Sequence, residues 1–454
     1  YADRLRLIAS QLKHGGDYHY HDWEVDGKST GGDTDVFKFF VERAWQLVGT
    51  NGRVGLVVPS AIYNNEGCTG LRHLLLDKSR VERFYCFENR DKIFDIDSRI
   101  KFISLVFNKI TDAQQMPANQ LPQAAETDGN YRADATFEAA FMRHDLAELD
   151  DPGPKPWMVT ISREELERLS PGTLAFLEYR DRRDRDILLK MFEGRPLLGA
   201  KGASIWNAEF YREFDLTNDK DLWSEPRTGK LWSVKGIIGK EPPDFAETRA
   251  RMADKGFWPL YQDAHIHQFV LEFKPLMRWV SLEAHDKKYK GKPDPEPKVV
   301  IRDMARNTDE RTCIAAVLPS CSGFGHTLNG VRVLPEYRDA FVALLNSLVF
   351  DYAARKRVGG QHVSPYMLQS VAVPPPAALA GKLKPIPHIH ANQKQTWVYD
   401  HEEYWPLLWH NEKAIAAAYN FSSSDLEFII TAFPIFTRKR HNYYKMLIDT
   451  LILK

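Results

Sequence analysis

Cysteine is scarce in this sequence, and long hydrophobic runs are missing from it. The spacing of the four cysteines fits neither a disulfide framework nor a thiolate zinc site: Cys68, Cys86, Cys313 and Cys321. No apolar run approaches the length of a membrane-spanning helix, and the first residues contain no secretory hydrophobic segment. We therefore expect a cytoplasmic protein that has no membrane partner.

A net charge is also missing, because 61 basic side chains balance 61 acidic ones. Gross electrostatics therefore do not indicate a polyanionic partner. Any nucleic-acid-binding face would have to arise by segregation of charge within the fold. The 454 residues are enough for two or three domains, each with its own hydrophobic core.

Clusters of metal-ligating residues are missing as well. Histidines spaced His-x-His occur three times, and no carboxylate or cysteine lies at a supporting spacing, so we favour solvated or stacked loops over metal sites: His19 and His21, His265 and His267, His388 and His390. The stretch Pro293–Lys298 contains the letters of a PD…ExK nuclease site, but its carboxylates lie too close together along a proline-rich loop. We expect neither a metal site nor a nuclease in this chain.

The most informative stretch is Gly31–Lys109, which has the pattern of an αβαββ unit. Apolar residues recur at helical spacing in Asp33–Ala44, and Arg53–Ser60 is a short apolar run typical of a buried parallel strand. A leucine-rich helix is expected next, and then two strand-like runs, Val81–Phe87 and Lys101–Asn108. This order is how many doubly wound α/β sheets end.

The order of residue types in this stretch narrows the interpretation. Asp35–Ala44 has the pattern DxxxxFVERA, a glycine-bearing turn leads to Val57-Val58-Pro59, and Phe87–Phe94 is followed by Lys101-Phe102. The sequence here resembles the gamma-class DNA adenine-N6 methyltransferases. It is more closely similar to the large chains of type IIG restriction–modification and related phage-defence systems.

This resemblance implies a fold and a domain order. We expect an α/β chain in which residues 1–115 are the C-terminal part of a Rossmann-like methyltransferase sheet. A helical connector (116–195), an α+β target-recognition domain (196–376) and a helical C-terminal tail (377–454) would follow. The resemblance also implies S-adenosyl-L-methionine as cofactor and double-stranded DNA as partner. Other restriction or phage-defence subunits are further candidate partners.

Three residues of the sheet unit correspond to functional positions of the family. Val36 and Phe40 fall where the family lines the adenine pocket of the methyl donor, although both also fit the core face of an amphipathic helix. Phe107, at the end of the last strand, matches the aromatic residue that stacks on the flipped-out target adenine, and Phe102 is the fallback. A phenylalanine at a strand end is more often a core residue, so the stacking role depends on the resemblance.

Two motifs of the family do not occur in the sequence. These are the glycine-rich turn that binds the donor and the (N/D)PP(Y/F) tetrapeptide that holds the target amino group. The Pro-Pro dipeptides, Pro242-Pro243 and Pro374-Pro375-Pro376, lie in another context. We therefore expect this chain to be the C-terminal part of a larger protein, and the resemblance alone does not imply activity of the isolated chain.

The remaining sequence divides into connecting and recognition-like segments. Residues 111–135 read as a surface linker, Phe137–Asp151 and Ser162–Leu169 as short helices, and Phe341–Ala354 as an apolar helix. Cations suit phosphates, and arginine and glutamine suit guanine and adenine edges. On this basis we predict DNA contacts from six residues: Arg302, Arg306, Lys356, Arg357, Gln361 and His362. For the cations near Lys356 the alternative is a solvated last helical turn.

Two functions of different classes fit these observations. The leading hypothesis is a site-specific DNA adenine-N6 methyltransferase to which this chain contributes the end of the catalytic domain and the recognition domain. The alternative is a non-catalytic DNA-binding specificity subunit that acts with a separate catalytic chain. Binding of the methyl donor would distinguish them.

Overall fold

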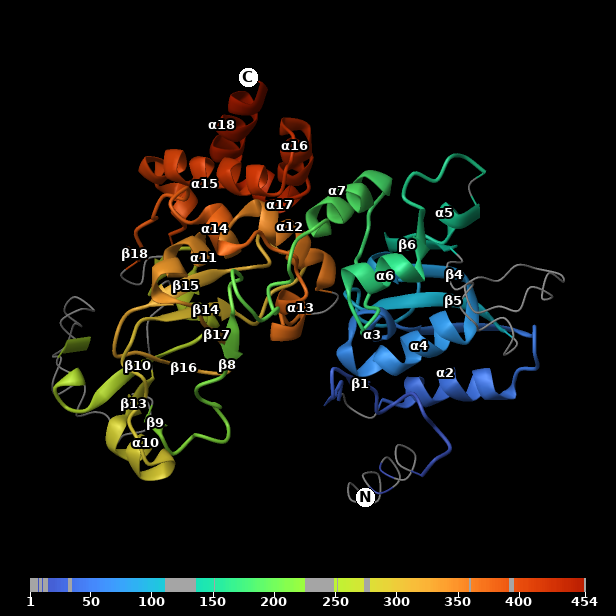
Figure 1. Cartoon of the computed structure of the whole chain (residues 1–454), viewed down its shortest axis with the longest axis horizontal. Helices are drawn as coiled ribbons and strands as arrows, with labels where there is room; N and C mark the ends of the chain where they lie inside the picture. The colour runs from blue at the N-terminus through green and yellow to red at the C-terminus, as the bar shows by residue number, and fades with distance from the viewer. Residues whose placement is uncertain are drawn as a thin grey trace. The chain divides into compact units, whose positions relative to one another are not determined.

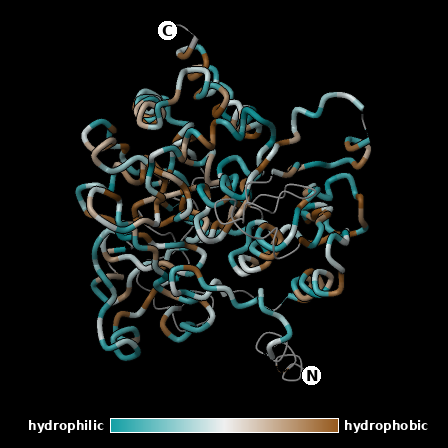
Figure 2. Tube along the Cα trace, turned by 45° about the vertical axis from the view of Figure 1, so that its right-hand side comes forward, coloured by the Kyte–Doolittle hydropathy of each residue, from teal (hydrophilic) through white to brown (hydrophobic). Residues whose placement is uncertain are grey.

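The computed structural model describes residues 7, 10, 15–31, 35–110, 136–150, 152–224, 249–250, 252–272, 278–358, 361–391 and 396–452. The chain divides into two compact units, Tyr1–Glu193 (unit 1) and Gly194–Lys454 (unit 2). Both contain strands and helices, and the end of unit 2 is helical (Figure 1). This architecture confirms the expected α/β fold class. Within each unit the hydrophobic residues lie mainly inside (Figure 2).

Unit 1 is built around a five-stranded sheet with the strand order β3-β5-β4-β6-β7. The strands have these bounds: β3 (Arg53–Pro59), β4 (Ser79–Glu88), β5 (Lys101–Lys109), β6 (Thr136–Arg143) and β7 (Val159–Ser162). Strand β5 is antiparallel to both neighbours, β4 and β6 are parallel, and β7 is antiparallel to β6. It follows that β3, β4 and β6 run in one direction and end at the same edge, where β5 begins.

Helices α2 and α4 lie along the same side of strands β4 and β5 (Figure 1). The helices in the described part of unit 1 are α2 (Val36–Leu47), α3 (Ala61–Asn64), α4 (Thr69–Asp77), α5 (Ala147–Asp150), α6 (Arg163–Leu169) and α7 (Arg182–Phe192). The side chain of Asp35 caps α2 by accepting from the amide of Phe37. A two-stranded ribbon, β1 (Glu24–Val25) and β2 (Lys28–Ser29), precedes α2.

Some elements agree with the prediction from the sequence and others do not. Arg53–Pro59 is strand β3 as expected, but in the described part of the chain it pairs with the antiparallel β5 alone and exposes alternate residues. The two strand-like runs are β4 and β5, and α6 begins directly after Ser162, which caps it. The expected helix over Phe137–Asp151 is wrong, because Thr136–Arg143 forms strand β6. Phe137 and Ala139 are buried while Glu138 between them is exposed, as in a strand that packs one face. Residues 111–135, the expected linker, lie outside the described residues.

A buried ion pair fixes the start of β5 to the segment that follows α6. The Nζ atom of Lys101 lies 2.7 Å and 2.9 Å from the two carboxylate oxygens of Glu178, and both side chains are buried. The hydroxyl of Tyr63, on α3, donates to the same carboxylate. Strands β6 and β7 extend the sheet, so this part of the expected connector belongs to unit 1.

The described residues of unit 2 form three small sheets, with the strand orders β15-β14-β17-β8, β16-β10-β13-β9 and β11-β12-β18. Their strands are β8 (Glu209–Tyr211), β9 (Trp223–Ser224), β10 (Phe257–Tyr261), β11 (Ile266–His267), β12 (Val270–Leu271), β13 (Trp279–Ser281), β14 (Lys298–Arg302), β15 (Ala315–Leu318), β16 (Gly323–Phe324), β17 (Leu328–Arg332) and β18 (Ile389–His390). Tyr261, Val300 and Leu328 belong to one buried cluster that joins residues of different sheets.

The described helices of unit 2 lie mostly after its sheets along the chain. They are α10 (Leu282–Tyr289), α11 (Arg338–Leu345), α12 (Leu348–Arg357), α13 (Pro365–Gln369), α14 (Pro376–Leu379), α15 (Trp405–Ala418), α16 (Ser423–Thr431), α17 (Pro434–Lys439) and α18 (His441–Ile452). The segment Phe341–Ala354, expected to be one helix, belongs to two helices. The helical conformation is interrupted at Asn346 and Ser347, and Ser347 caps α12. Among the described residues, no helix is long and apolar enough to cross a membrane.

We predict that Lys101→Ala destabilises unit 1 by about 3–5 kcal/mol, because it leaves the Glu178 carboxylate buried without its cation. Hydrogen–deuterium exchange of β5 peptides measures the change. The matched control is Arg53→Ala, which breaks the pair between Arg53, 67% exposed, and Glu82, and should cost less than about 1 kcal/mol. Equal losses in the two variants would contradict a structural role for the buried pair.

Candidate functional site

The direction of the strands in unit 1 defines one edge of the sheet as the candidate site. Strands β3 and β4 end there at Pro59 and Glu88, and β5 begins there at Lys101. The pairing register confirms this arrangement, because Pro59 and Phe87 both lie opposite Phe102. Ligands of open α/β sheets bind outside the carboxyl ends of parallel strands. We call this the carboxyl edge.

Helix α2 presents exposed apolar side chains next to β3. It packs on β3 and joins it through the turn Gly49–Gly52 at the other edge of the sheet, so its first turns point toward the carboxyl edge. Val36 and Phe40 are 64% and 67% exposed. They are four residues apart and therefore share one face of the helix. The alternative that both are core residues is wrong, since Phe39 and Val41 fill that role.

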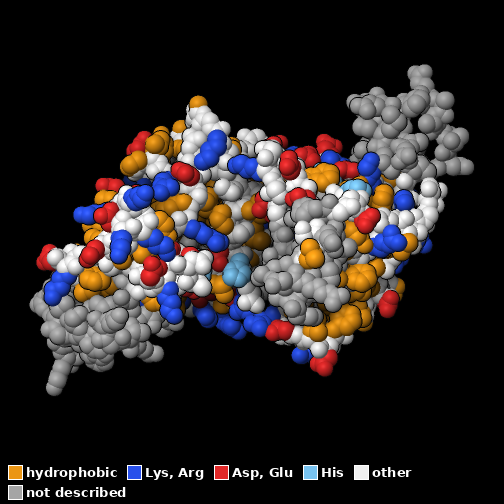
Figure 3. All heavy atoms as spheres, turned by 90° about the horizontal axis from the view of Figure 1, so that it is seen from below, with side chains coloured by type: hydrophobic (Ala, Val, Ile, Leu, Met, Phe, Trp, Pro, Cys, Tyr) orange, Lys and Arg blue, Asp and Glu red, His pale blue; other side chains and the backbone are white. Residues whose placement is uncertain are grey.

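Figure 3 shows hydrophobic side chains gathered at the surface of unit 1. A second exposed apolar group lies at the carboxyl edge itself, in the loop between β4 and β5. Phe94 is 42% exposed, and Ile96 and Ile100 are exposed to a similar degree. The ring of Phe94 meets Phe102 edge to face with the ring centroids 4.8 Å apart, and Phe102 stacks on Phe87 at 5.5 Å. Contacts between the three rings thus connect the exposed Phe94 through Phe102 to the buried Phe87.

Phe107 does not lie at this edge. It is fully buried and pairs with Val54 and Val81, near the starts of β3 and β4. Because β5 is antiparallel to its neighbours, its last residues lie at the opposite edge from their carboxyl ends. The structure therefore does not present the Phe107 ring for the stacking role that the resemblance implied. Phe102, the fallback, lies at the carboxyl edge but is also buried.

The exposed aromatic residue that the sequence analysis passed over is Phe94. The signal for it was present, because Phe94 closely follows the carboxyl end of a strand that runs parallel to β3. Reading β5 as antiparallel would have directed attention to its first residues and to the loop before them.

The polar groups behind the edge are arranged for stability. Burial raises the pKa of the Cys86 thiol to about 12, and burial together with Glu178 raises the pKa of Tyr63 well above its ordinary value. Neither side chain is therefore ionised near neutral pH. Glu88, at the end of β4, lies 3.0 Å from Arg90 and 3.0 Å from His144. The candidate site thus offers apolar and aromatic surface, with the paired Glu88, Arg90 and His144 beside it.

In unit 2 the structure brings together three of the residues predicted to contact DNA. The amide of Ala305 donates to the carbonyl of Gln361 at 3.2 Å, and Met304 forms a bridge with His362. The exposed His362 ring lies 2.6 Å from the Asp303 carboxylate. The Arg306 guanidinium is partly exposed and lies 3.3 Å from Asp309. We call Arg306, Gln361 and His362 the polar cluster of unit 2.

The other three predicted cations do not have free side chains at the surface. The Arg302 guanidinium donates to the backbone carbonyl of Ile266, and burial lowers its pKa. Lys356 and Arg357 are only 3% and 5% exposed. They lie in the last turn of α12, which packs on α11, α13, α15 and α16. The expectation of an exposed basic turn after Ala354 is therefore wrong, because neighbouring helices surround it.

The histidine pairs lie in different surroundings. His21 is buried and lies 2.9 Å from Glu42, whereas His390 lies 2.8 Å from Glu272. Burial lowers the pKa of His267 well below its ordinary value and that of His388 to about 4. The described residues contain no group of three or more side chains suited to hold a metal ion.

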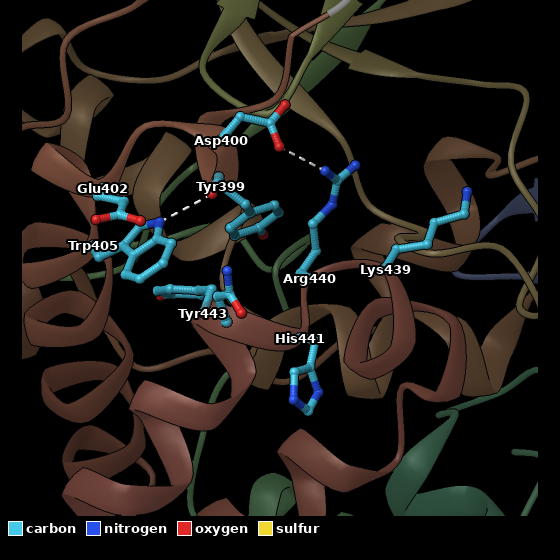
Figure 4. A pocket seen from close by; sticks show the side chains of 9 residues that line it. Tyr399, Asp400, Glu402, Trp405, Lys439, Arg440, His441 and Tyr443 are labelled. Carbon is cyan, nitrogen blue, oxygen red and sulfur yellow. Dashed lines mark hydrogen bonds and ion pairs between the residues drawn. The ribbon is translucent and has the colours of Figure 1, made fainter.

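A separate cavity of about 330 Å³ lies among the C-terminal helices of unit 2 (Figure 4). Its lining residues are Tyr399, Asp400, Glu402, Trp405, Lys439, Arg440, His441, Asn442 and Tyr443. Arg440 bonds to Asp400 at 2.8 Å and to Glu310 at 2.7 Å. Because carboxylates already pair with this cation, the cavity lacks the excess positive charge that a phosphate would require.

Comparison with known proteins bears on the carboxyl edge. Residues 10–94 match the model of the family described as Eco57I restriction-modification methylase. The match covers α2, β3, α4, β4 and the loop as far as Phe94. This part of the chain therefore carries the sequence signature of a restriction-modification methylase. No curated protein matches the chain.

Solved structures that resemble the chain include two restriction enzymes and one protein–DNA complex. The Type IIL restriction-modification enzyme MmeI in complex with DNA is 11% identical, with a TM-score of 0.44 over 88% of this chain and 51% of its own. The type IIG restriction endonuclease BpuSI is 12% identical, with a TM-score of 0.29 over 99% and 52%. The DrdV–DNA complex is 10% identical, with a TM-score of 0.33 over 73% and 38%. The chain thus spans about half the length of these proteins or less.

We predict that Lys356 resists acetylation by acetic anhydride, because its amine is buried in the last turn of α12. Lys287 on α10 is exposed and serves as the matched control. Peptide mass spectrometry after a short pulse should find Lys287 acetylated at least about tenfold faster than Lys356, as burial of an amine restricts access. Similar acetylation rates for the two lysines would contradict the burial of Lys356 and support an exposed basic turn after Ala354.

Proposed function

We propose that the protein is a site-specific DNA adenine-N6 methyltransferase of the gamma class, in a type IIG restriction–modification or phage-defence system. In this proposal unit 1 holds the end of the catalytic domain, and residues 196–376 of unit 2 hold the target-recognition domain, with residues 377–454 as its helical support. One observation carries the proposal. The restriction-modification methylase signature covers the segment that presents Val36, Phe40 and Phe94 toward the carboxyl edge.

The methyl donor in this proposal is S-adenosyl-L-methionine, which supplies an electrophilic methyl group. The exposed face of α2 fits its adenine ring, because Val36 and Phe40 offer adjacent apolar surface that no other described side chain covers. Burial of that surface would favour binding by about 25 cal/mol per Å². In the described part of the chain β3 pairs with β5 alone, and we assign the rest of the donor-binding sheet to the free edge of β3.

The base-stacking role passes from Phe107 to Phe94. Taking a base out of a duplex costs a few kcal/mol of stacking and pairing, and an aromatic side chain restores part of this cost. Phe94 has an exposed ring, and Phe102 supports it from behind. Direct methyl transfer to an exocyclic amine also requires polar groups at that amine. The (N/D)PP(Y/F) tetrapeptide does this in the family that the sequence resembles.

Recognition of double-stranded DNA is assigned to the polar cluster of unit 2. Arginine pairs in two-point fashion with guanine, and glutamine does so with adenine. Arg306, Gln361 and His362 lie on two paired segments, and the contact of Asp303 with His362 orients the imidazole ring. Lys356 and Arg357 stabilise α12 in this account and do not contact DNA. A cytoplasmic location and further restriction or phage-defence subunits remain part of the proposal.

We predict that disruption of the gene in its host removes N6-methyladenine from one recurring sequence of the genome. Single-molecule sequencing of DNA from the parent and the disrupted strain measures this directly, and it also identifies the target sequence. The methyl mark should return when the natural gene is restored. Identical adenine methylation in the two strains would exclude the methyltransferase function.

Variants of the restored gene separate the two hypotheses. If the chain has a catalytic role, the double variant Val36→Asp/Phe40→Asp should abolish the methyl mark. The purified variant should also bind the methyl donor more weakly than the natural protein does. A non-catalytic specificity subunit would retain the mark in this variant. Arg306→Ala should weaken or broaden the target sequence, as loss of a two-point base contact costs about 1–3 kcal/mol. The matched control is Arg438→Ala, which removes an exposed arginine outside the polar cluster.

A further inference from the structure

The loop between β4 and β5 is held by one buried amide side chain. Asn89 directly follows the last residue of β4 and is fully buried. Its side-chain nitrogen donates to the carbonyls of Phe94 at 2.9 Å, Ile96 at 3.1 Å and Asp97 at 3.3 Å. Its side-chain oxygen accepts from the amide of Phe94 at 2.9 Å. One side chain thus satisfies both backbone groups of Phe94.

Other contacts fix the remainder of the same loop. The backbone amide of Asn89 donates to the carbonyl of Ile100, which closes the loop at its base at 2.9 Å. Lys92 turns the chain with a left-handed backbone (φ 58°), and its Nζ atom donates to the carbonyl of Ile96. Asp97 bonds to the backbone and side chain of Arg99. The loop therefore has a defined conformation although it is exposed.

This rigid loop is unusual because it exposes its apolar side chains instead of burying them. Phe94, Ile96 and Ile100 all face solvent, each more than two fifths exposed. An ordered loop with exposed apolar groups is suited to contact another apolar surface without loss of conformational entropy on binding. The flat face of an unstacked nucleobase is such a surface.

We propose that Asn89 is a positioning residue that holds the Phe94 ring at the carboxyl edge for contact with an extruded nucleobase. The inference rests on the proposed function and adds to it the group that fixes the stacking ring. Asparagine is required because its two N–H groups are shared among three carbonyls while its oxygen accepts from the Phe94 amide. Aspartate has the same shape but would set an acceptor against those carbonyls. The conservative change is therefore the informative one.

The test uses the natural full-length protein, S-adenosyl-L-methionine and a duplex that contains the target sequence found by genome sequencing. Asn89→Asp and Phe94→Ala should each lower kcat of methyl transfer by about tenfold or more, the value of a lost base–aromatic stack. The KM for the donor should change by less than about threefold, because the donor-binding face on α2 is untouched. The double variant should be no slower than the slower single variant.

Two measurements separate positioning from general damage. With 2-aminopurine at the target position, the wild-type protein should raise its fluorescence as the base leaves the stack, and Asn89→Asp should alter the emission as Phe94→Ala does. Hydrogen exchange should increase only in peptides of residues 89–100. Phe94→Tyr keeps the ring and should retain most of the kcat. Asn51→Asp, in an exposed turn at the opposite edge, is the matched control.

Each outcome decides between the two claims. A wild-type protein that transfers no methyl group overturns the proposed function, and the role of Asn89 falls with it. An active wild type with unchanged kcat in Asn89→Asp overturns the positioning role alone. Asn89→Asp could lose exchange protection throughout unit 1. In that case Asn89→Ser, which adds no charge, replaces it in the comparison with Phe94→Ala. Additive losses in the double variant would also contradict the inference.

Discussion

The antiparallel insertion of β5 between β3 and β4 is the constraint on which the candidate site depends. It makes the two outer strands parallel and sends their carboxyl ends to the edge at which β5 begins. The loop after β4, the first residues of β5 and the first turns of α2 are therefore directed to one edge. Reversal of this one strand would send the same side chains to different places without any change in local structure.

The carboxyl edge of the sheet is supported from inside by buried groups with a structural role. The buried pair of Lys101 and Glu178 anchors the start of β5, and the rings of Phe102 and Phe87 fill the space beneath Phe94. Asn89 then fixes the loop above them. A rigid support of this kind allows an exposed ring to keep its position without a bound partner, and preorganised contacts cost less on binding. The polar cluster of unit 2 follows the same principle, since Asp303 holds His362 in place.

The sequence was a good guide where local pattern decides the structure. The strands β4 and β5 and the helix after Ser162 follow from periodicity and capping. The family signature over residues 10–94 overlaps most of the stretch Gly31–Lys109 that residue order singled out. It was a poor guide where partners distant in sequence decide. Thr136–Arg143 becomes a strand because β4 offers it a parallel partner, which no local pattern in that segment reveals.

The errors in the predicted site have the same origin. Phe107 was assigned from its place at a strand end, but the direction of the strand puts that end at the wrong edge. Lys356 and Arg357 have the sequence of a solvated helix terminus, but α15 and α16 pack around α12. In contrast, Arg306, Gln361 and His362 were named separately and meet in space, because a β-bridge joins the segments that carry them.

The central claim is that the methyl donor and the target base meet unit 1 at its carboxyl edge. Hydrogen–deuterium exchange of the natural protein, measured with and without S-adenosyl-L-methionine and duplex DNA, tests this most directly. The account predicts that the donor protects the first turns of α2 and that DNA protects residues 89–100. Protection at the opposite edge, in residues 49–53 and 105–110, would contradict it, as would no change anywhere in unit 1.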